Sequence, residues 1–167
     1  MRKYLGSSVF PTLLAGFAFL SATNVATAQS ASDLVGTWQL VCVINTAKDG
    51  AKSDVFGPDP RGMMILGPDG HFVQVLTRPG LPKFAAENRL QGTPDENKAI
   101  VQGSIALYGS YSVVEKTLVL HVESGTWPAW TGTEQKRPLT SYTGNEMSWT
   151  LQASVGGTNV TTFRRVK

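Results

Sequence analysis

The sequence predicts an all-β domain in which about eight antiparallel strands close into a barrel or pack as a sandwich. Apolar and polar residues alternate with a two-residue period through most of the chain after residue 33, as in strands with one buried face. Turn signals rich in Gly, Pro, Asn and Asp separate these segments at the spacing typical of all-β folds. A single capped helical segment interrupts the pattern.

The first 28 residues are predicted to be a secretory signal peptide. Two basic residues precede an apolar stretch, and Ala26-Thr27-Ala28 forms a small-residue cleavage motif. The apolar run is interrupted and shorter than the ~20 residues of a membrane span, so we expect no integral membrane anchor after cleavage. The chain therefore divides into a signal peptide, 1–28, and one exported domain, 29–167, in the periplasm or outside the cell.

Composition argues against several classes of partner. Two of the 15 basic residues and none of the 12 acidic ones lie in the signal peptide, so the formal charge of +3 falls to +1 after cleavage. That balance gives no sign of a nucleic-acid partner. With Cys42 as the only cysteine and with two histidines, we expect no intramolecular disulfide, no metal site and no cofactor.

The strands can be placed in order. Residues 34–44 begin the domain, with Trp38, Leu40, Cys42 and Ile44 on one face that we expect to line the core. The remaining strands are expected in hairpins, the first across the turn signal Gly67-Pro68-Asp69-Gly70: 63–66 with 71–76, 105–114 with 117–123, 134–142 with 147–151, and a closing strand over 160–166.

One segment predicts a short helix. Thr93-Pro94-Asp95-Glu96 contains a hydroxyl cap, a proline at the first helical position and a glutamate three residues after the cap, and 97–103 continues it. We expect this helix near a barrel mouth, where it would cover the opening.

Four stretches in this order resemble the bacterial lipocalin-like domain family of small calycin barrels: residues 34–38, 57–62 leading into 67–71, 108–111, and 121–132 followed by Arg137. The resemblance implies an up-and-down barrel in which Trp38 packs across one end with a last-strand arginine over its ring. We assign this arginine to Arg165, which shares a strand face with Phe163. Both Trp38 and Arg165 are then structural, and the resemblance leaves the function open.

The segment 117–123 can face the barrel in two ways. His121 and Glu123 share one face, and Leu118, Leu120 and Val122 share the other. Alternation permits the aliphatic face to point inward, with the His/Glu pair in water. The resembled family repeats a histidine, a glutamate, a tryptophan and an arginine in this region, which implies that His121 and Glu123 line a cavity.

The next strand supports a cavity with polar groups. Glu134 and Lys136 suit solvent, so Gln135 and Arg137 are expected to point inward, where the arginine needs Glu123 or the acidic group of a ligand as a partner. Trp130 is expected at the rim of the ligand site. Of the two tyrosines spaced three apart in 108–111, we include Tyr111 among the ligand-binding residues.

These residues predict an exported protein that binds a small, mostly apolar or amphipathic ligand with a polar or acidic group. One alternative is a cofactor-free acid–base enzyme, an isomerase, cyclase or hydrolase, that uses His121 and Glu123. The other is a non-catalytic envelope protein whose barrel is filled by side chains. The oligomeric state is not specified by the sequence.

Overall fold

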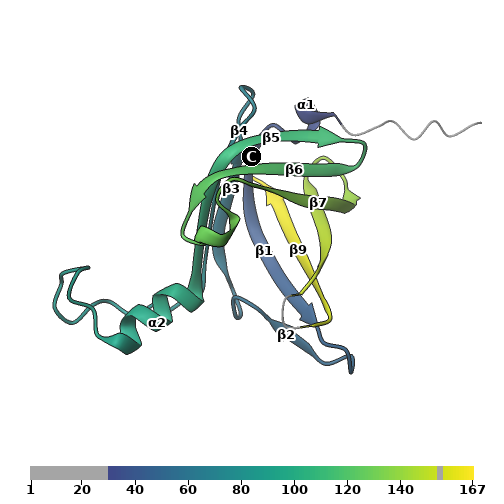
Figure 1. The fold of residues 1–167 in the computed structure, drawn as a ribbon. Helices are drawn as coiled ribbons and strands as arrows, with labels where there is room; N and C mark the ends of the chain where they lie inside the picture. The colour runs from purple at the N-terminus through teal and green to yellow at the C-terminus, as the bar shows by residue number, and fades with distance from the viewer. Residues whose placement is uncertain (1–29, 154–155) are drawn as a thin grey trace, which may run out of the picture.

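The structure is a closed antiparallel β-barrel. The computed structural model describes residues 30–153 and 156–167, and in these the neighbouring strands follow the order β2-β1-β3-β4-β5-β6-β7-β8-β9. β1 also pairs with β9, so eight strands form a closed wall, and the short β2 lies alongside one end of β1 (Figure 1). The strands are β1 (Gly36–Thr46), β2 (Lys52–Asp54), β3 (Arg61–Leu66), β4 (His71–Thr77), β5 (Ser104–Val114), β6 (Thr117–Gly125), β7 (Thr133–Tyr142), β8 (Glu146–Gln152) and β9 (Thr158–Arg165). The predicted up-and-down barrel of about eight strands is confirmed.

The barrel has two different ends. A one-turn helix, α1 (Ala31–Leu34), leads into the start of β1 at one end, which we call the capped end. At the opposite end β1 finishes, β9 begins and β2 lies beside them; we call this the open end (Figure 1). A 3₁₀ turn, η1 (Pro128–Trp130), lies between β6 and β7.

Trp38 and Arg165 hold the capped end together. The Trp38 side chain is fully buried, and its indole N–H donates to the carbonyl of Leu34 at 2.8 Å. The Arg165 guanidinium lies 4.2 Å from the centroid of the Trp38 ring. It also donates at 2.6 Å to each of three backbone carbonyls, those of Asp33, Val35 and Gly144. This arginine is therefore buried in part but fully partnered, which is the arrangement expected of a structural group.

A bulge in β1 changes which residues face the core. Leu40 pairs with Phe163, but Cys42 pairs with Thr162, so one residue of β1 is extra at this point. After the bulge it is Val43 that is buried, whereas Cys42 and Ile44 are only partly buried. The expectation that Cys42 and Ile44 line the core was wrong, because simple alternation carries no sign of an inserted residue.

The inner face of β6 is aliphatic. Leu118 and Leu120 are fully buried and Val122 is 2% exposed, so the opposite residues, His121 among them, face away from the core. This settles the orientation that alternation had left open.

The helix α2 (Pro94–Gly103) has the predicted cap. The Thr93 hydroxyl accepts from the Glu96 N–H, and the Glu96 carboxylate accepts from the backbone N–H of Thr93 at 2.7 Å. The two backbone N–H groups that the Glu96 carboxylate binds, those of Thr93 and Ala85, hold its pKa below the usual value. The helix runs directly into β5 at the open end, but it extends away from the barrel rather than across the opening (Figure 1).

The predicted signal peptide and its cleavage after Ala28 lie outside the described residues. Within the part of the chain that the structure describes, no helix is both long and apolar enough to span a membrane.

Candidate functional site

A cavity of about 160 Å³ lies inside the barrel toward the open end. Inner faces of six strands, η1 and the segment after β2 supply its lining: Val43, Val55, Phe56, Gln74, Leu76, Ile105, Trp130, Arg137, Trp149, Leu151, Asn159 and Thr161. Most of these side chains are apolar, with a few polar groups among them. A mostly apolar lining with a few polar groups is common in small-molecule sites.

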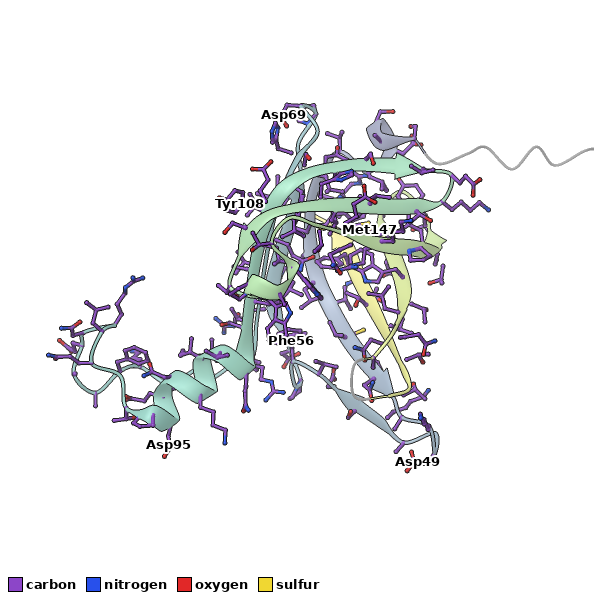
Figure 2. All side chains as sticks on the ribbon, viewed as in Figure 1. Asp49, Phe56, Asp69, Asp95, Tyr108 and Met147 are labelled. Atoms are coloured by element: carbon purple, nitrogen blue, oxygen red, sulfur yellow. The ribbon has the colours of Figure 1, made fainter. Side chains whose placement is uncertain are left out.

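A short irregular segment after β2 forms part of the cavity wall at the open end. Val55 and Phe56 follow β2, and Figure 2 shows Phe56 at the open end of the barrel. The Val55 N–H donates to the Val43 carbonyl at 2.9 Å. The Val55 carbonyl in turn accepts two bonds from the Arg78 guanidinium, at 3.1 and 2.7 Å. These bonds fix the segment on both sides, so Val55 and Phe56 can serve as part of a defined wall.

Arg137 is the central charged group of the cavity. It lies on the inner face of β7, opposite Leu118 on β6, and is only 5% exposed. Burial lowers the pKa of its guanidinium to about 10. Its contacts in the protein are a 3.1 Å bond to the carbonyl of Lys136 and the face of the Trp130 ring, whose centroid is 5.4 Å away.

No carboxylate of residues 30–153 or 156–167 forms an ion pair with Arg137. A buried guanidinium offers five N–H donors and usually meets a carboxylate or phosphate. Arg165 differs, because each of its three guanidinium nitrogens donates to a backbone carbonyl. Arg137 is therefore a buried cation in a mostly apolar cavity, without a carboxylate partner among the described residues.

Trp130 and Trp149 form aromatic surfaces of the cavity. Trp130 ends the 3₁₀ turn that Pro128 begins, and this turn places the indole against the Arg137 guanidinium. Trp149 lies on the inner face of β8 and packs against Phe163, with ring centroids 5.3 Å apart. Either indole would report on a bound molecule through its fluorescence.

Three polar cavity residues were not predicted from the sequence. Gln74 is 5% exposed on the inner face of β4, between the buried Phe72 and Leu76. Asn159 accepts a bond of 2.8 Å from the buried Asn45, and Thr161 is 7% exposed. The sequence did indicate an inward Gln74, because this polar residue alternates in phase with the apolar Phe72 and Leu76 of the same strand. The β9 residues carried a signal too, because Asn159 and Thr161 lie in phase with Phe163 on the two-residue period of a regular strand.

His121 and Glu123 do not enter the cavity. His121 lies on the outer face of β6, where its Nδ1 is 3.3 Å from Glu134 and its Nε2 is 3.5 Å from the Ser112 hydroxyl. Glu123 is exposed at a second bulge, where β6 passes Gly109 of β5. Because Glu123 shares the outer face of β6 with His121, neither residue can act on a ligand inside the barrel.

The outer face around His121 is slightly hollowed. A groove of about 350 Å³ is lined by Ser112, Val114, Glu115, Thr117, Val119, His121, Glu134 and Lys136. The side chains of His121 and Glu134 are 41% and 56% exposed. The central sheet backbone beneath them is already paired with its neighbours, which leaves no amide donors for an oxyanion. Ser112, His121 and Glu134 therefore form a row of hydrogen-bonded side chains on the outer surface of the barrel.

Tyr111 and Gln135 point inward but lie away from the cavity lining. Tyr111 is 7% exposed, and its hydroxyl donates to the carbonyl of Gly67 at 2.8 Å, at the capped end. Burial and the nearby Asp69 carboxylate raise its phenol pKa. The Gln135 amide donates to the Thr133 hydroxyl at 2.9 Å on its own strand. Of the six predicted ligand residues, the structure therefore brings Trp130 and Arg137 together in the cavity.

The closed eight-stranded wall, the capped end and the internal cavity define the chain as a lipocalin-like barrel. Residues 35–164 match the family described as the lipocalin-like domain, and the protein belongs to that family. A comparison with curated proteins found no match.

Solved structures with a similar fold include designed barrels. A redesigned β-barrel has 18% identity and a TM-score of 0.42, with 84% of this chain and 97% of that chain covered. A de novo designed fluorescence-activating β-barrel has 14% identity and a TM-score of 0.38, over 81% of this chain and 96% of that chain. A redesigned β-barrel bound to DFHBI has 22% identity and a TM-score of 0.38, over 81% and 98%.

Proposed function

We propose that this protein binds a small, mostly apolar molecule with an acidic group, and that the acid pairs with Arg137. The observation that carries the proposal is a guanidinium 5% exposed, inside an apolar cavity, with no carboxylate partner in the described residues. An unpaired buried charge destabilises a protein by several kcal/mol. A ligand carboxylate would supply the missing partner and two parallel hydrogen bonds.

The size of the cavity limits the enclosed part of the ligand. A volume of about 160 Å³ is close to that of an apolar cavity known to accept benzene, about 150 Å³. The enclosed body is then one ring or a short aliphatic chain, and a longer ligand would extend through the open end. Arg137, Gln74 and Asn159 would orient the polar group, while Trp130, Trp149 and Leu76 would contact the body.

Export is the second part of the proposal. It is supported by the basic start, the apolar stretch and the Ala26-Thr27-Ala28 motif of the first 28 residues. N-terminal sequencing of the protein recovered from outside the cytoplasm tests it. A mature chain that begins at Gln29 is expected, and an intact Met1 on the recovered protein would contradict export by this signal.

Binding is tested with a matched pair of probes, 3-phenylpropanoate and 3-phenylpropanol, followed by tryptophan fluorescence. The two differ only in the acid, so the proposal expects the acid to bind at least tenfold more tightly. Arg137→Gln should abolish the preference without removing binding of the alcohol. Arg164→Gln is the control, because Arg164 is an exposed cation paired with Glu146 at 3.3 Å outside the barrel. Equal affinity for both probes, or a preference that survives Arg137→Gln, would refute the role of Arg137.

A further inference from the structure

The outer surface of the barrel has one continuous apolar face. Five large side chains on β3, β4 and β5 point away from the core and are 40–50% exposed: Met63, Ile65, Val73, Val75 and Tyr108. They are cross-strand neighbours, since Met63 pairs with Val75, Ile65 with Val73, and Val73 with Tyr108. We call these five residues the apolar wall. Exposed single apolar residues are common, but a contiguous group of this kind marks a contact surface.

A second apolar feature leaves the barrel beside this wall. The segment between β4 and β5, residues 78–103, includes α2 and extends away from the barrel (Figure 1). We call it the arm. Its Leu90 and Val101 side chains are 82% and 68% exposed. In Figure 2 Tyr108 of the wall lies on the same side of the barrel as the arm, so wall and arm form the two sides of a corner.

The arm has a structure of its own. The Phe84 ring lies against Gly92, and the Glu96 carboxylate binds the backbone N–H of Ala85 at 2.9 Å. It contacts the barrel at its two ends, where Arg78 donates to the Val55 carbonyl and where α2 runs into β5. The arm therefore projects as an ordered unit whose apolar side chains have no counterpart on their own barrel.

We infer that a second copy of this chain fills the corner, so that the apolar walls of the two copies pack against each other and each arm lies along the partner barrel. Both surfaces, wall and arm, are present on one chain, and the arm leaves the barrel between β4 and β5, two of the three strands that carry the wall. This is what an isologous two-fold interface requires. Seven of the ten large apolar side chains that are exposed among the described residues belong to the wall and the arm.

Charge favours a second copy over a lipid surface. The outward residues of the wall are neutral along its middle, with Arg61 and His71 only at its two ends. The arm mixes basic with acidic residues and is not a basic cluster: Arg78, Lys83, Arg89 and Lys98 with Glu87, Asp95 and Glu96. A membrane-binding surface usually carries a cluster of lysine and arginine around its apolar residues. A domain with a formal charge of +1 after signal cleavage also meets little repulsion from its own copy.

The test is the mass in solution of residues 30–167, which contain every described element, by sedimentation equilibrium across the micromolar range. The wild-type chain should be a dimer. Val73→Lys puts a charge in the centre of the wall and should weaken the dimer at least tenfold. Val114→Lys is the matched control, because Val114 is 58% exposed on β5 outside the wall. Tyr108→Lys repeats the test at another wall position in case Val73→Lys does not fold.

The arm is tested separately with Leu90→Asp and Val101→Asp, which should also weaken the dimer. A wild-type chain that is monomeric at every concentration would overturn the inference, as would wall variants as dimeric as Val114→Lys. Dimers unaffected by both arm variants would refute the contact of the arm. A monomer that sediments with phosphatidylcholine vesicles, and loses this with Val73→Lys, would show the wall to be a lipid surface instead.

Discussion

Replacing Arg137 with methionine should make the empty protein more stable while it destroys acid binding. Burial lowers the pKa of the Arg137 guanidinium to about 10, a shift that corresponds to about 3 kcal/mol by which burial disfavours the charged form. The Trp130 ring and the Lys136 carbonyl offset part of this, by about 1–2 kcal/mol together. Methionine would fill much of the same volume without a charge, so the expected gain is about 1–2 kcal/mol in the free energy of unfolding.

The assay is equilibrium unfolding in urea at neutral pH, with the midpoint temperature as a second measure. For a domain of this size the gain corresponds to roughly 3–8 °C in Tm. Arg165→Met is the matched control, since Arg165 also lies over a tryptophan but donates to the carbonyls of Asp33, Val35 and Gly144. Its loss leaves these carbonyls unpaired and should cost about 3 kcal/mol or more.

The opposite result for Arg137 would refute the reasoning. If Arg137→Met lowers the free energy of unfolding by more than about 1 kcal/mol, the guanidinium is a structural group like Arg165, and the cavity does not hold a cation for a ligand. A gain in stability joined to a loss of binding is the combination expected of a functional residue.

Three further predictions follow from particular contacts. Affinity for 3-phenylpropanoate should be constant near neutral pH and should fall below about pH 4–5, where the ligand is protonated. It should fall again as the pH rises past about 10, because the lowered pKa of Arg137 lets the guanidinium lose its proton there. Fluorescence titrations at a series of pH values measure this, and a midpoint near 6.5 would instead indicate a histidine. Gly109→Ala should lower the free energy of unfolding in urea by about 1–3 kcal/mol, because the new methyl group would clash with the carbonyl oxygen of His121 across the bulge. An unchanged urea midpoint would contradict that close approach. Thr93→Ala should cost about 1 kcal/mol in the local stability of α2. Hydrogen exchange over 94–103 should become faster with little change in Tm, because α2 makes few contacts with the barrel. Unchanged protection would contradict the role of the cap.

The fold could be predicted from the sequence because its information is local. The turn at Gly67-Pro68-Asp69-Gly70 joins β3 to β4 as expected, and the capping box at Thr93 begins α2. The position of Trp38 and Arg165 at one end followed from the resemblance and from the strand face that Arg165 shares with Phe163. These features depend on a few adjacent residues or on a two-residue period.

The candidate site could be predicted only in part, because it depends on bulges and on long-range pairing. Arg137 and Trp130 were recognised, since β7 alternates without interruption from Thr133 to Leu139. The bulge after Leu40 exchanged Cys42 for Val43 on the inner face. Alternation in β6 permitted either face to point inward, and the buried Leu118, Leu120 and Val122 leave Glu123 outside. Gln74 carried a signal that was overlooked, a lone amide in phase with two apolar residues. Asn159 and Thr161 likewise lie in phase with Phe163, so the two-residue period of β9 placed them on the inner face before the strand pairing was known.

A crystal structure of the chain with 3-phenylpropanoate tests the central claim most directly. The account predicts the carboxylate within about 2.7–2.9 Å of the Arg137 guanidinium nitrogens, with the phenyl ring inside the cavity against Trp130 and Trp149. A ligand bound with its carboxylate in solvent, bound in the outer groove at His121, or absent from a cavity that stays empty at saturating concentration would contradict it.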